Sequence, residues 1–280
     1  MRGRRVETPD EVLVEEYLAF EPAESLAGML DIPAPDGDEL PQLWHWIYLL
    51  ERRPERDLGP DGHPTHGIPA PPGPGRRRMF AGGRVSTVRP LLLGAPATRT
   101  TRVVSTQEKT GRTGPLTFVT VRNTITQDGE VAIVDEQDIV YRTPDSTLPA
   151  ASSAPSDSGE VREPSLSLDV DTRLMFRFSA LTYNAHRIHY DRDFVAEEGY
   201  ADLLVHGPLQ ALMMGELFRR HDLSLVGREY SYRLVSPMVG SQTMTVRPGR
   251  DGLDAGAEVL DADGRVTATS TLRDLTADLG

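Results

Sequence analysis

The chain has 280 residues, a formal net charge of -12 and an isoelectric point near 5.1. This acidity argues against nucleic-acid binding, because domains that bind nucleic acids are normally basic. The chain contains no cysteine, which excludes disulfide bonds, thiolate nucleophiles and cysteine-based zinc or iron–sulfur sites. At a typical domain size of roughly 150 residues, the length predicts about two domains.

The sequence gives no sign of a membrane segment. Its basic start, residues 1–5, resembles the first part of a signal peptide, but Glu15 and Glu16 interrupt the apolar stretch that should follow. No apolar run approaches the ~20 residues that a membrane-spanning helix needs. We therefore expect a cytoplasmic protein that does not enter a membrane.

The first 80 residues predict short helices followed by a long loop. Residues 9–18 could begin a short helix, and residues 22–30 predict a second one. The apolar and aromatic residues 40–50 are the best candidate for a buried helix, which Arg52-Arg53-Pro54 would end. Residues 54–78 are rich in proline and glycine and predict an irregular loop, which either lines a site or forms a surface excursion.

From residue 79 the pattern changes to strands. Four alternating or β-rich segments occupy residues 83–89, 101–109, 116–126 and 131–141. The Asp128-Gly129 pair between the last two predicts a hairpin turn. Residues 143–166 consist largely of proline, serine, alanine and aspartate, which is typical of a flexible linker.

The second half repeats this order of elements without a clear repeat of residues. A loop-rich stretch over 174–206 precedes a predicted helix over 208–220. Four predicted strands then follow, at residues 229–236, 241–247, 254–261 and 265–274. The chain therefore reads as two halves, each with helix first and antiparallel sheet second.

The helix over 208–220 is apolar on nearly every side. Pro208 suits its first position, where a missing N–H costs nothing. The apolar side chains are those of Leu209, Ala211, Leu212, Met213, Met214, Leu217 and Phe218. Such a helix must be buried on all sides, as it would be inside a wrapped antiparallel sheet. This predicts an α+β hot dog, and two such halves predict a double hot dog; the alternative is an ordinary helix packed on a sheet.

The start of this helix suits chemistry on a carbonyl oxygen. The backbone N–H groups of Gly207 and Leu209 have no partner within the helix, and the helix dipole is positive there. An anion or a thioester oxygen would be stabilised at that point. The alternative is a plain helix start that His206 or solvent caps.

Three of the seven histidines, His186, His189 and His206, fall close to this helix start in the sequence. Histidine titrates near neutrality and can serve as a general acid or base. Asn184 can hold a water molecule but cannot take a proton, and Asp191 or Tyr190 could orient an imidazole ring. The three histidines, with Asp191 nearby, could instead form a metal site. Their spacing matches no standard metal motif, however, so we expect no metal and no cofactor.

These residues resemble the MaoC-like enoyl-CoA hydratase family, which pairs an Asp-x-x-x-x-His motif with a later His-Gly. Here residues 184–189 occupy the first motif and His206-Gly207 the second, with Asn184 in place of the aspartate. The resemblance implies that His189 is the catalytic histidine and that the N–H of Gly207 donates to the thioester oxygen. An asparagine cannot share acid–base work with the imidazole as the family's carboxylate does.

The resemblance is strongest to the hydratase 2 branch that contains mesaconyl-C4-CoA hydratases, itaconyl-CoA hydratases and hydroxyacyl-thioester dehydratases of type 2. It rests on residues 178–191, and in the first half on residues 61–64 and 77–83. It implies a double hot dog in which residues 1–145 form a non-catalytic half that houses part of the acyl chain. Residues 146–166 would be the linker and residues 167–280 the catalytic half.

The predicted activity is the reversible hydration of an α,β-unsaturated acyl thioester, which is equally the dehydration of a 3-hydroxyacyl thioester. The acyl carrier would be CoA or acyl carrier protein. His189 would remove the α-proton in the dehydration direction and Asn184 would position the water, while Asp191 or His186 could relay the second proton. The predicted substrate-binding residues are Tyr183, Arg187, His206, Leu209, Phe80, Gly82 and Arg84.

Two other functions stay open at this point. Asn184 could mark a catalytically inactive protein that only binds acyl thioesters, or the fold could be that of a hot-dog thioesterase. A homodimer is also compatible with the sequence.

Overall fold

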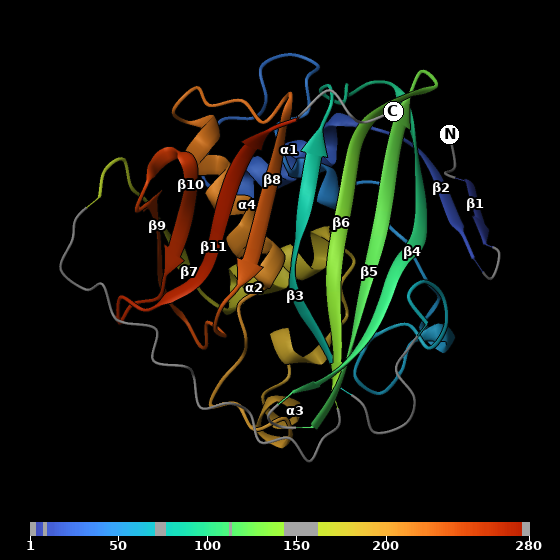
Figure 1. Ribbon diagram of the computed structural model, residues 1–280, viewed down its shortest axis with the longest axis vertical. Helices are drawn as coiled ribbons and strands as arrows, with labels where there is room; N and C mark the ends of the chain where they lie inside the picture. The colour runs from blue at the N-terminus through green and yellow to red at the C-terminus, as the bar shows by residue number, and fades with distance from the viewer. Residues whose placement is uncertain (1–3, 8–9, 71–76, 112–113, 143–161, 276–280) are drawn as a thin grey trace.

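The computed structural model describes residues 4–7, 10–70, 77–111, 114–142 and 162–275. Its strands form one antiparallel sheet of 11 strands in the order β1-β2-β4-β5-β6-β3-β8-β11-β10-β9-β7. Helices α4, α1 and α2 lie together behind one face of this sheet (Figure 1). The architecture is therefore α+β, with the sheet curved around a helical layer.

All four strands predicted for the first half are present, but the first two begin earlier than predicted. They are β3 (Arg77–Thr87), β4 (Pro96–Gly111), β5 (Gly114–Gln127) and β6 (Glu130–Arg142). Asp128 and Gly129 both adopt positive φ, 55° and 79°, between β5 and β6. These angles are those of the two-residue hairpin turn that Asp-Gly favours, so the predicted turn is confirmed.

The helix predicted over residues 9–18 is wrong. β1 (Arg4–Glu7) and β2 (Val12–Tyr17) form a hairpin there, and β2 extends the sheet by pairing with β4. Val12 and Val14 are buried at every second position, which is the period of a strand that has one face buried. This short apolar run fits both a helical period and a strand period, and its pairing with β4 makes it a strand.

The helix predicted over residues 22–30 is confirmed as α1 (Phe20–Met29), but the long helix over 40–50 is wrong. Only the 3-10 turn η1 (Trp44–Ile47) forms there, and Leu43 and Leu49 on either side adopt left-handed backbone angles. Trp44 is buried and its indole N–H donates to Glu216 of α4 at 2.8 Å. The segment is therefore buried as expected, but it packs across α4 as an irregular strap.

The second half contains more helix than the sequence predicted. Its elements are β7 (Leu166–Val170), α2 (Thr172–Leu181), η3 (Arg187–His189), α3 (Arg192–Glu197), α4 (Gly207–Arg219), β8 (Arg228–Leu234), β9 (Gln242–Gly249), β10 (Gly252–Leu260) and β11 (Val266–Asp274). The predicted helix over 208–220 and all four later strands are confirmed. α2 lies in the stretch expected to be loop-rich, and Asp171 caps it by accepting the N–H of Leu174.

Strand β3 joins the two halves by pairing with β8 of the second half. Ten of the residues of α4 are buried, so the helix is enclosed as its apolar surface required. The predicted linker 146–166 lies mostly outside the described residues, and Leu166 already belongs to β7. Among the described residues, no helix is long and apolar enough to cross a membrane.

Gly82 is required where β3 meets β8. Its φ is +145°, and a Cβ atom there would lie 2.2 Å from the carbonyl oxygen of Tyr232. We expect Gly82→Ala to lower the free energy of unfolding by about 1–3 kcal/mol, as backbone strain and overpacking do. Gly28→Ala in α1 is the matched control, because a Cβ there meets nothing within 4 Å. It should stabilise the protein by roughly 0.4–1 kcal/mol; equal urea midpoints for the two variants would contradict this account of Gly82.

Candidate active site

His189 is held at the end of η3 in a single tautomer. Its side chain is buried, and its Nδ1 atom lies 2.8 Å from the carbonyl oxygen of Leu204. Since a carbonyl only accepts hydrogen bonds, Nδ1 must carry the proton and Nε2 is left with a free lone pair. Burial lowers the pKa of His189 to about 4, against the opposing effect of the Leu204 bond. His189 is therefore a neutral imidazole with a basic nitrogen at physiological pH.

His206 brings His189 to the start of α4. The two rings stack with centroids 3.6 Å apart and planes 17° apart. The Nε2 atom of His206 lies 2.8 Å from the hydroxyl of Ser179 on α2, and burial holds its pKa well below the usual value. His206 is thus a neutral, fully buried packing partner, and it directly precedes Gly207.

Gly207 is the first residue of α4, and among the described residues no side chain caps this helix. The alternative in which His206 caps the helix is therefore not observed. A Cβ atom at Gly207 would lie 2.2 Å from Leu234, so glycine lets the helix start close against β8. Leu209, two residues later, is fully buried in the core. The N–H groups at 207 and 209 belong to the first turn and have no partner within the helix.

Asn184 is part of a tight turn beside α2. Its N–H donates to the carbonyl of Ser179 at 2.8 Å, and its side-chain oxygen accepts the N–H of His186 at 3.0 Å. The neighbouring Tyr183 adopts a φ of 51° and is 56% exposed. These contacts give Asn184 a structural role in shaping the loop, while the predicted roles of Asn184 and Tyr183 toward substrate stay predictions.

Arg187 and Asp191 pair with each other at the surface. The Arg187 guanidinium lies 2.7 Å from the Asp191 carboxylate, which also caps α3 by accepting the N–H of Phe194. The hydrogen bond from Arg187 lowers the pKa of Asp191, so this carboxylate stays ionised. Pairing and capping account for both residues, and the predicted proton relay through Asp191 and substrate contact by Arg187 stay predictions.

His186 links the second half of the chain to a histidine of the first half. Its ring centroid lies 5.7 Å from that of His189 and 3.9 Å from that of His63. Burial, followed by the neighbouring imidazoles, lowers the pKa of His186 to about 2. His63, His186, His189 and His206 thus form a continuous row, which we call the imidazole row.

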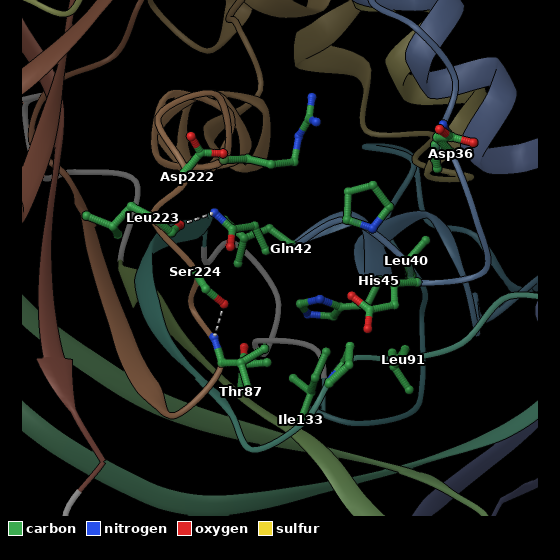
Figure 2. A pocket seen from close by; sticks show the side chains of 17 residues that line it. Asp36, Leu40, Gln42, His45, Thr87, Leu91, Ile133, Asp222, Leu223 and Ser224 are labelled. Carbon is green, nitrogen blue, oxygen red and sulfur yellow. Dashed lines mark hydrogen bonds between the residues drawn. The ribbon is translucent and has the colours of Figure 1, made fainter.

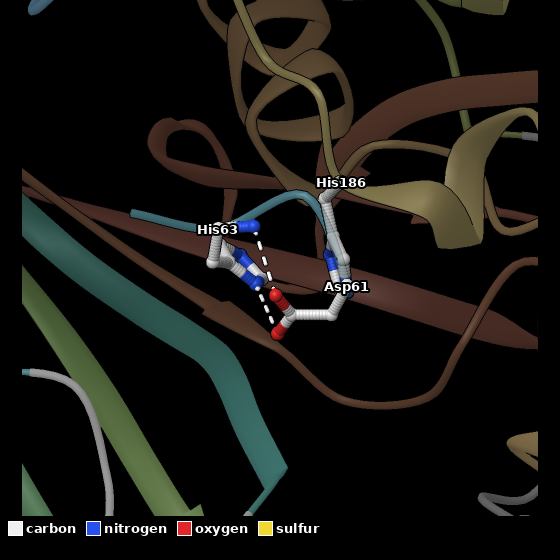
Figure 3. A group of neighbouring side chains, drawn as sticks. All are labelled: Asp61, His63 and His186. Carbon is white, nitrogen blue, oxygen red and sulfur yellow. Dashed lines mark hydrogen bonds and ion pairs between the residues drawn. The ribbon is translucent and has the colours of Figure 1, made fainter. Parts of the chain in front are cut away.

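Asp61 holds His63 in this row (Figure 3). One carboxylate oxygen lies 3.0 Å from Nδ1 of His63, and the other accepts the backbone N–H of His63 at 2.9 Å. The hydrogen bond from His63 holds the pKa of Asp61 well below its usual value, so the carboxyl is ionised. Asp61 and His63 are not among the site residues predicted from the sequence, although the segment 61–64 that contains them carries part of the family resemblance.

The loop that carries Asp61 is fitted against the loop that carries His186. The carbonyl of Asp61 accepts the backbone N–H of Arg187 at 2.9 Å. A Cβ atom at Gly62 would lie 1.8 Å from the carbonyl oxygen of Ala185, and the φ of Gly62 is +85°. No side chain fits between the two loops at this point. Of the two alternatives for residues 54–78, this part of the loop lines the site.

The cluster also has the residue types of a metal site. Asp61, His63 and His186 each offer one ligand atom, and these atoms lie within 4.8 Å of one another. Two histidines and one carboxylate form a recognised ligand set for divalent metals. In the observed arrangement, however, Nδ1 of His63 faces the Asp61 carboxylate. The expectation of no metal stays a prediction.

The first-half substrate-binding candidates have structural partners elsewhere. Phe80 packs against Tyr232 at 6.1 Å between ring centroids, and Gly82 sits at the junction of β3 and β8. Arg84 lies 2.7 Å from Glu136 and 3.2 Å from Asp138. Their predicted contacts with substrate stay predictions.

A separate cavity of about 380 Å³ lies at the far end of α4 (Figure 2). Arg219, the last residue of the helix, and Asp222 line it, and His45 points into it. Gly207 and the imidazole row are at the opposite end of the helix. This cavity is therefore not part of the site described above.

Comparison with known proteins identifies the family. Residues 43–240 match the model of the hydroxyacyl-thioester dehydratase type 2 family. The chain is 43% identical over 267 residues to mesaconyl-C(4)-CoA hydratase of Chloroflexus aurantiacus, covering 92% of this chain and 94% of that protein. This chain belongs to the hydroxyacyl-thioester dehydratase type 2 family. A shorter match, 34% over 76 residues, covers 26% of this chain and 25% of the mitochondrial hydroxyacyl-thioester dehydratase type 2 of Schizosaccharomyces pombe.

Solved structures support the fold. HtdX of Mycobacterium tuberculosis superposes with a TM-score of 0.66 at 16% identity, over 98% of this chain and all of that one. A MaoC-like dehydratase from Phytophthora capsici gives 0.65 at 13% identity, over 98% of both chains. A further M. tuberculosis protein, described as having a double hot-dog fold, gives 0.53 at 12% identity over 97% of this chain and 96% of that one. The predicted double hot dog and the predicted hydro-lyase class are both confirmed.

The low pKa of His189 predicts a pH dependence of stability. Between its folded pKa of about 4 and its usual 6.5, the unfolded chain binds a proton that the folded chain does not. Stability should therefore fall as the pH falls through this window. At 1.36 kcal/mol per pKa unit, His189 should account for about 2 kcal/mol of loss between about pH 7.5 and about pH 5. Urea unfolding of wild type and His189→Gln at both pH values measures this contribution to the free energy of unfolding. If both proteins lost the same free energy of unfolding between the two pH values, His189 would not have the assigned protonation state.

Proposed function

We propose that the start of α4 and His189 together catalyse the reversible hydration of an α,β-unsaturated acyl thioester. The observation that carries this proposal is the stacking of His189, with its Nε2 lone pair free, on the residue that precedes Gly207. An acid–base group and an unpaired main-chain donor then serve one small volume. These are the two groups that reaction at the α-carbon of a thioester requires.

The N–H of Gly207 would donate to the thioester oxygen as negative charge develops on it. A main-chain donor of this kind lowers the barrier by about 3 kcal/mol, helped by the positive end of the helix dipole. In the dehydration direction, Nε2 of His189 would take the α-proton. Burial keeps the ring neutral, so the base is available without first losing a proton. The bond from Nδ1 to Leu204 then stabilises the ring once it is protonated.

The acyl group of the curated relative suggests a finer proposal. A mesaconyl thioester carries one free carboxylate, which needs a cationic partner when it is bound. Arg78 on β3 is half-buried, and burial lowers the pKa of its guanidinium against the opposing effects of Tyr141 and Asp61. Its charge thus acts on Asp61, beside the imidazole row. We propose that Arg78 binds the free carboxylate of a short dicarboxylic acyl group.

CoA is the proposed carrier, because the relative that covers most of this chain is named for a CoA thioester. The cytoplasmic location and the homodimer expected from the sequence stay proposals. Sedimentation of the purified protein would test the homodimer.

The direct test of the proposed function is His189→Gln, which keeps a side-chain N–H for Leu204 but removes the basic nitrogen. We expect kcat for hydration of crotonyl-CoA or mesaconyl-CoA to fall by about 10²–10⁴-fold, the usual contribution of an acid–base group. The loss of enoyl-thioester absorbance follows the reaction. His221→Gln, just beyond the opposite end of α4, is the matched control. Undiminished hydration by His189→Gln would end the assignment.

The same assay separates the alternative functions. A hot-dog thioesterase would release free CoA, which a thiol reagent detects, whereas hydration leaves the thioester intact. A binding protein without activity would gain thermal stability with acyl-CoA but would turn over no enoyl thioester. The proposal requires turnover without release of thiol.

The carboxylate contact has its own test. Arg78→Met should raise KM for mesaconyl-CoA about 10-fold to 100-fold, the cost of one charge-assisted hydrogen bond, and should leave KM for crotonyl-CoA almost unchanged. Arg122→Met on β5, which removes a guanidinium paired with Glu136, is the control. An equal effect of Arg78→Met on both substrates would exclude a contact to the free carboxylate.

A further inference from the structure

The proposed function does not say which residue donates the proton that the leaving hydroxyl needs. Dehydration removes a proton from C2 and must also deliver one to the hydroxyl that leaves C3. Position 184 holds an asparagine, whose amide cannot donate or accept a proton at physiological pH, and its oxygen already accepts the N–H of His186. Asp191, the carboxylate nearest in sequence, caps α3 and pairs with Arg187.

We propose that the first half of the chain supplies this group, with His63 as the second catalytic acid–base residue and Asp61 as the residue that positions it. This inference deepens the proposed function and depends on it. The missing carboxylate of the second half would be replaced by a carboxylate–imidazole pair that reaches the site across the interface between the halves.

The geometry of the pair fixes which nitrogen reacts. The Asp61 carboxylate lies 3.0 Å from Nδ1 of His63 and can only accept, so Nδ1 carries a proton and Nε2 is the nitrogen free to exchange one. The second oxygen of Asp61 binds the backbone N–H of His63, which prevents the carboxylate from turning away. A carboxylate that orients an imidazole and stabilises its protonated form has the same role in serine hydrolases.

The position of His63 suits the leaving hydroxyl. Its ring lies 3.9 Å from His186 and continues the imidazole row that leads to His189. Its side chain is 23% exposed, whereas His189 is buried, so His63 can exchange protons with solvent. The part of the imidazole row at His189 is therefore shielded from water and carries a free basic nitrogen, and the end at His63 is open to water.

The site is built to hold this pair in place. The backbone N–H of Arg187 donates to the carbonyl oxygen of Asp61 at 2.9 Å, and the guanidinium of Arg187 donates to the carbonyl oxygen of Pro60 at 3.0 Å. These two bonds hold the loop of Asp61 in place. Gly62, between the two functional residues, leaves no room for a side chain against Ala185. Such fitting is needed where a catalytic group belongs to a different half of the chain from its partner.

The proposed steps balance in protons and electrons. In dehydration, Nε2 of His189 takes the proton from C2, and the C2–H electrons move through the enolate to form the C2–C3 double bond. The C3–O bond breaks, and the hydroxyl leaves with that electron pair and takes the proton from Nε2 of protonated His63, which forms water. After product release, the proton on His189 returns to His63 through water. Hydration is the reverse sequence.

The test uses His63→Gln, Asp61→Asn, the double variant and the control His66→Gln, which lies on the same loop and is exposed. We expect His63→Gln to lower kcat about 10²–10⁴-fold with little change in KM. The double variant should be no slower than His63→Gln alone, because residues that act as a unit are not additive. His66→Gln should match wild type. Wild-type kcat in His63→Gln, or losses that multiply in the double variant, would overturn the proposal.

Asn184→Asp supplies a readout that a purely structural role would not give. In the His63→Gln background, it restores a carboxylate at the motif position and should raise kcat by about 10-fold or more; no gain would contradict the proposal. Activity should also be unchanged by a chelator, and a loss on chelation that Zn²⁺ or Mg²⁺ restores would instead make the cluster a metal site. If the wild-type protein shows no turnover, the proposed function itself has failed. If wild type and His63→Gln are both active and His189→Gln is inactive, the proposed function stands and only the role of His63 has failed.

Discussion

The site depends on one contact between the two halves of the chain, where the loop of Asp61 and Gly62 fits against the loop of residues 185–187. A main-chain hydrogen bond from Arg187 and a glycine without space for a Cβ atom fix the two loops together. The sheet makes this possible, because β3 and β8 pair and hold both halves in one frame. Without that frame, the imidazole row would be divided between two independent bodies.

The buried row explains how the site can contain so many histidines. Burial lowers the pKa values of His186, His189 and His206, so these three rings pack together as neutral groups without mutual repulsion. Three of the rings have a fixed hydrogen-bond partner: Ser179 for His206, the Leu204 carbonyl for His189 and Asp61 for His63. These partners orient the rings. Because burial lowers the pKa values of the histidines, the free energy of unfolding should fall at acid pH. The family membership fits hydration or dehydration of an acyl thioester, and the row contains groups of the type that acid–base catalysis of such a reaction needs.

The sequence predicted what depends on local pattern. The helix at 208–220 was clear from its all-round apolar surface, and the turn at Asp128-Gly129 from its residue types. The two wrong helix predictions fail because of contacts with distant parts of the chain. Residues 40–50 pack across α4 as an irregular strap, and the segment of Val12 and Val14 forms a strand because it pairs with the edge of β4. The family resemblance names His189 and Gly207 as candidates, and their catalytic roles stay predictions. The same resemblance covers Asp61 and His63 through residues 61–64, but their contact with His186 exists only in the folded chain.

The most direct test of the account is a crystal structure of the His189→Gln variant with an enoyl-CoA or a 3-hydroxyacyl-CoA bound. We expect the thioester oxygen within hydrogen-bond distance of the N–H of Gly207, and C2 facing the side chain of residue 189. The C3 hydroxyl, or the water that replaces it, should face Nε2 of His63. A thioester bound elsewhere, for example in the cavity at the far end of α4, would contradict it. So would an acyl group in the site with C3 turned away from His63.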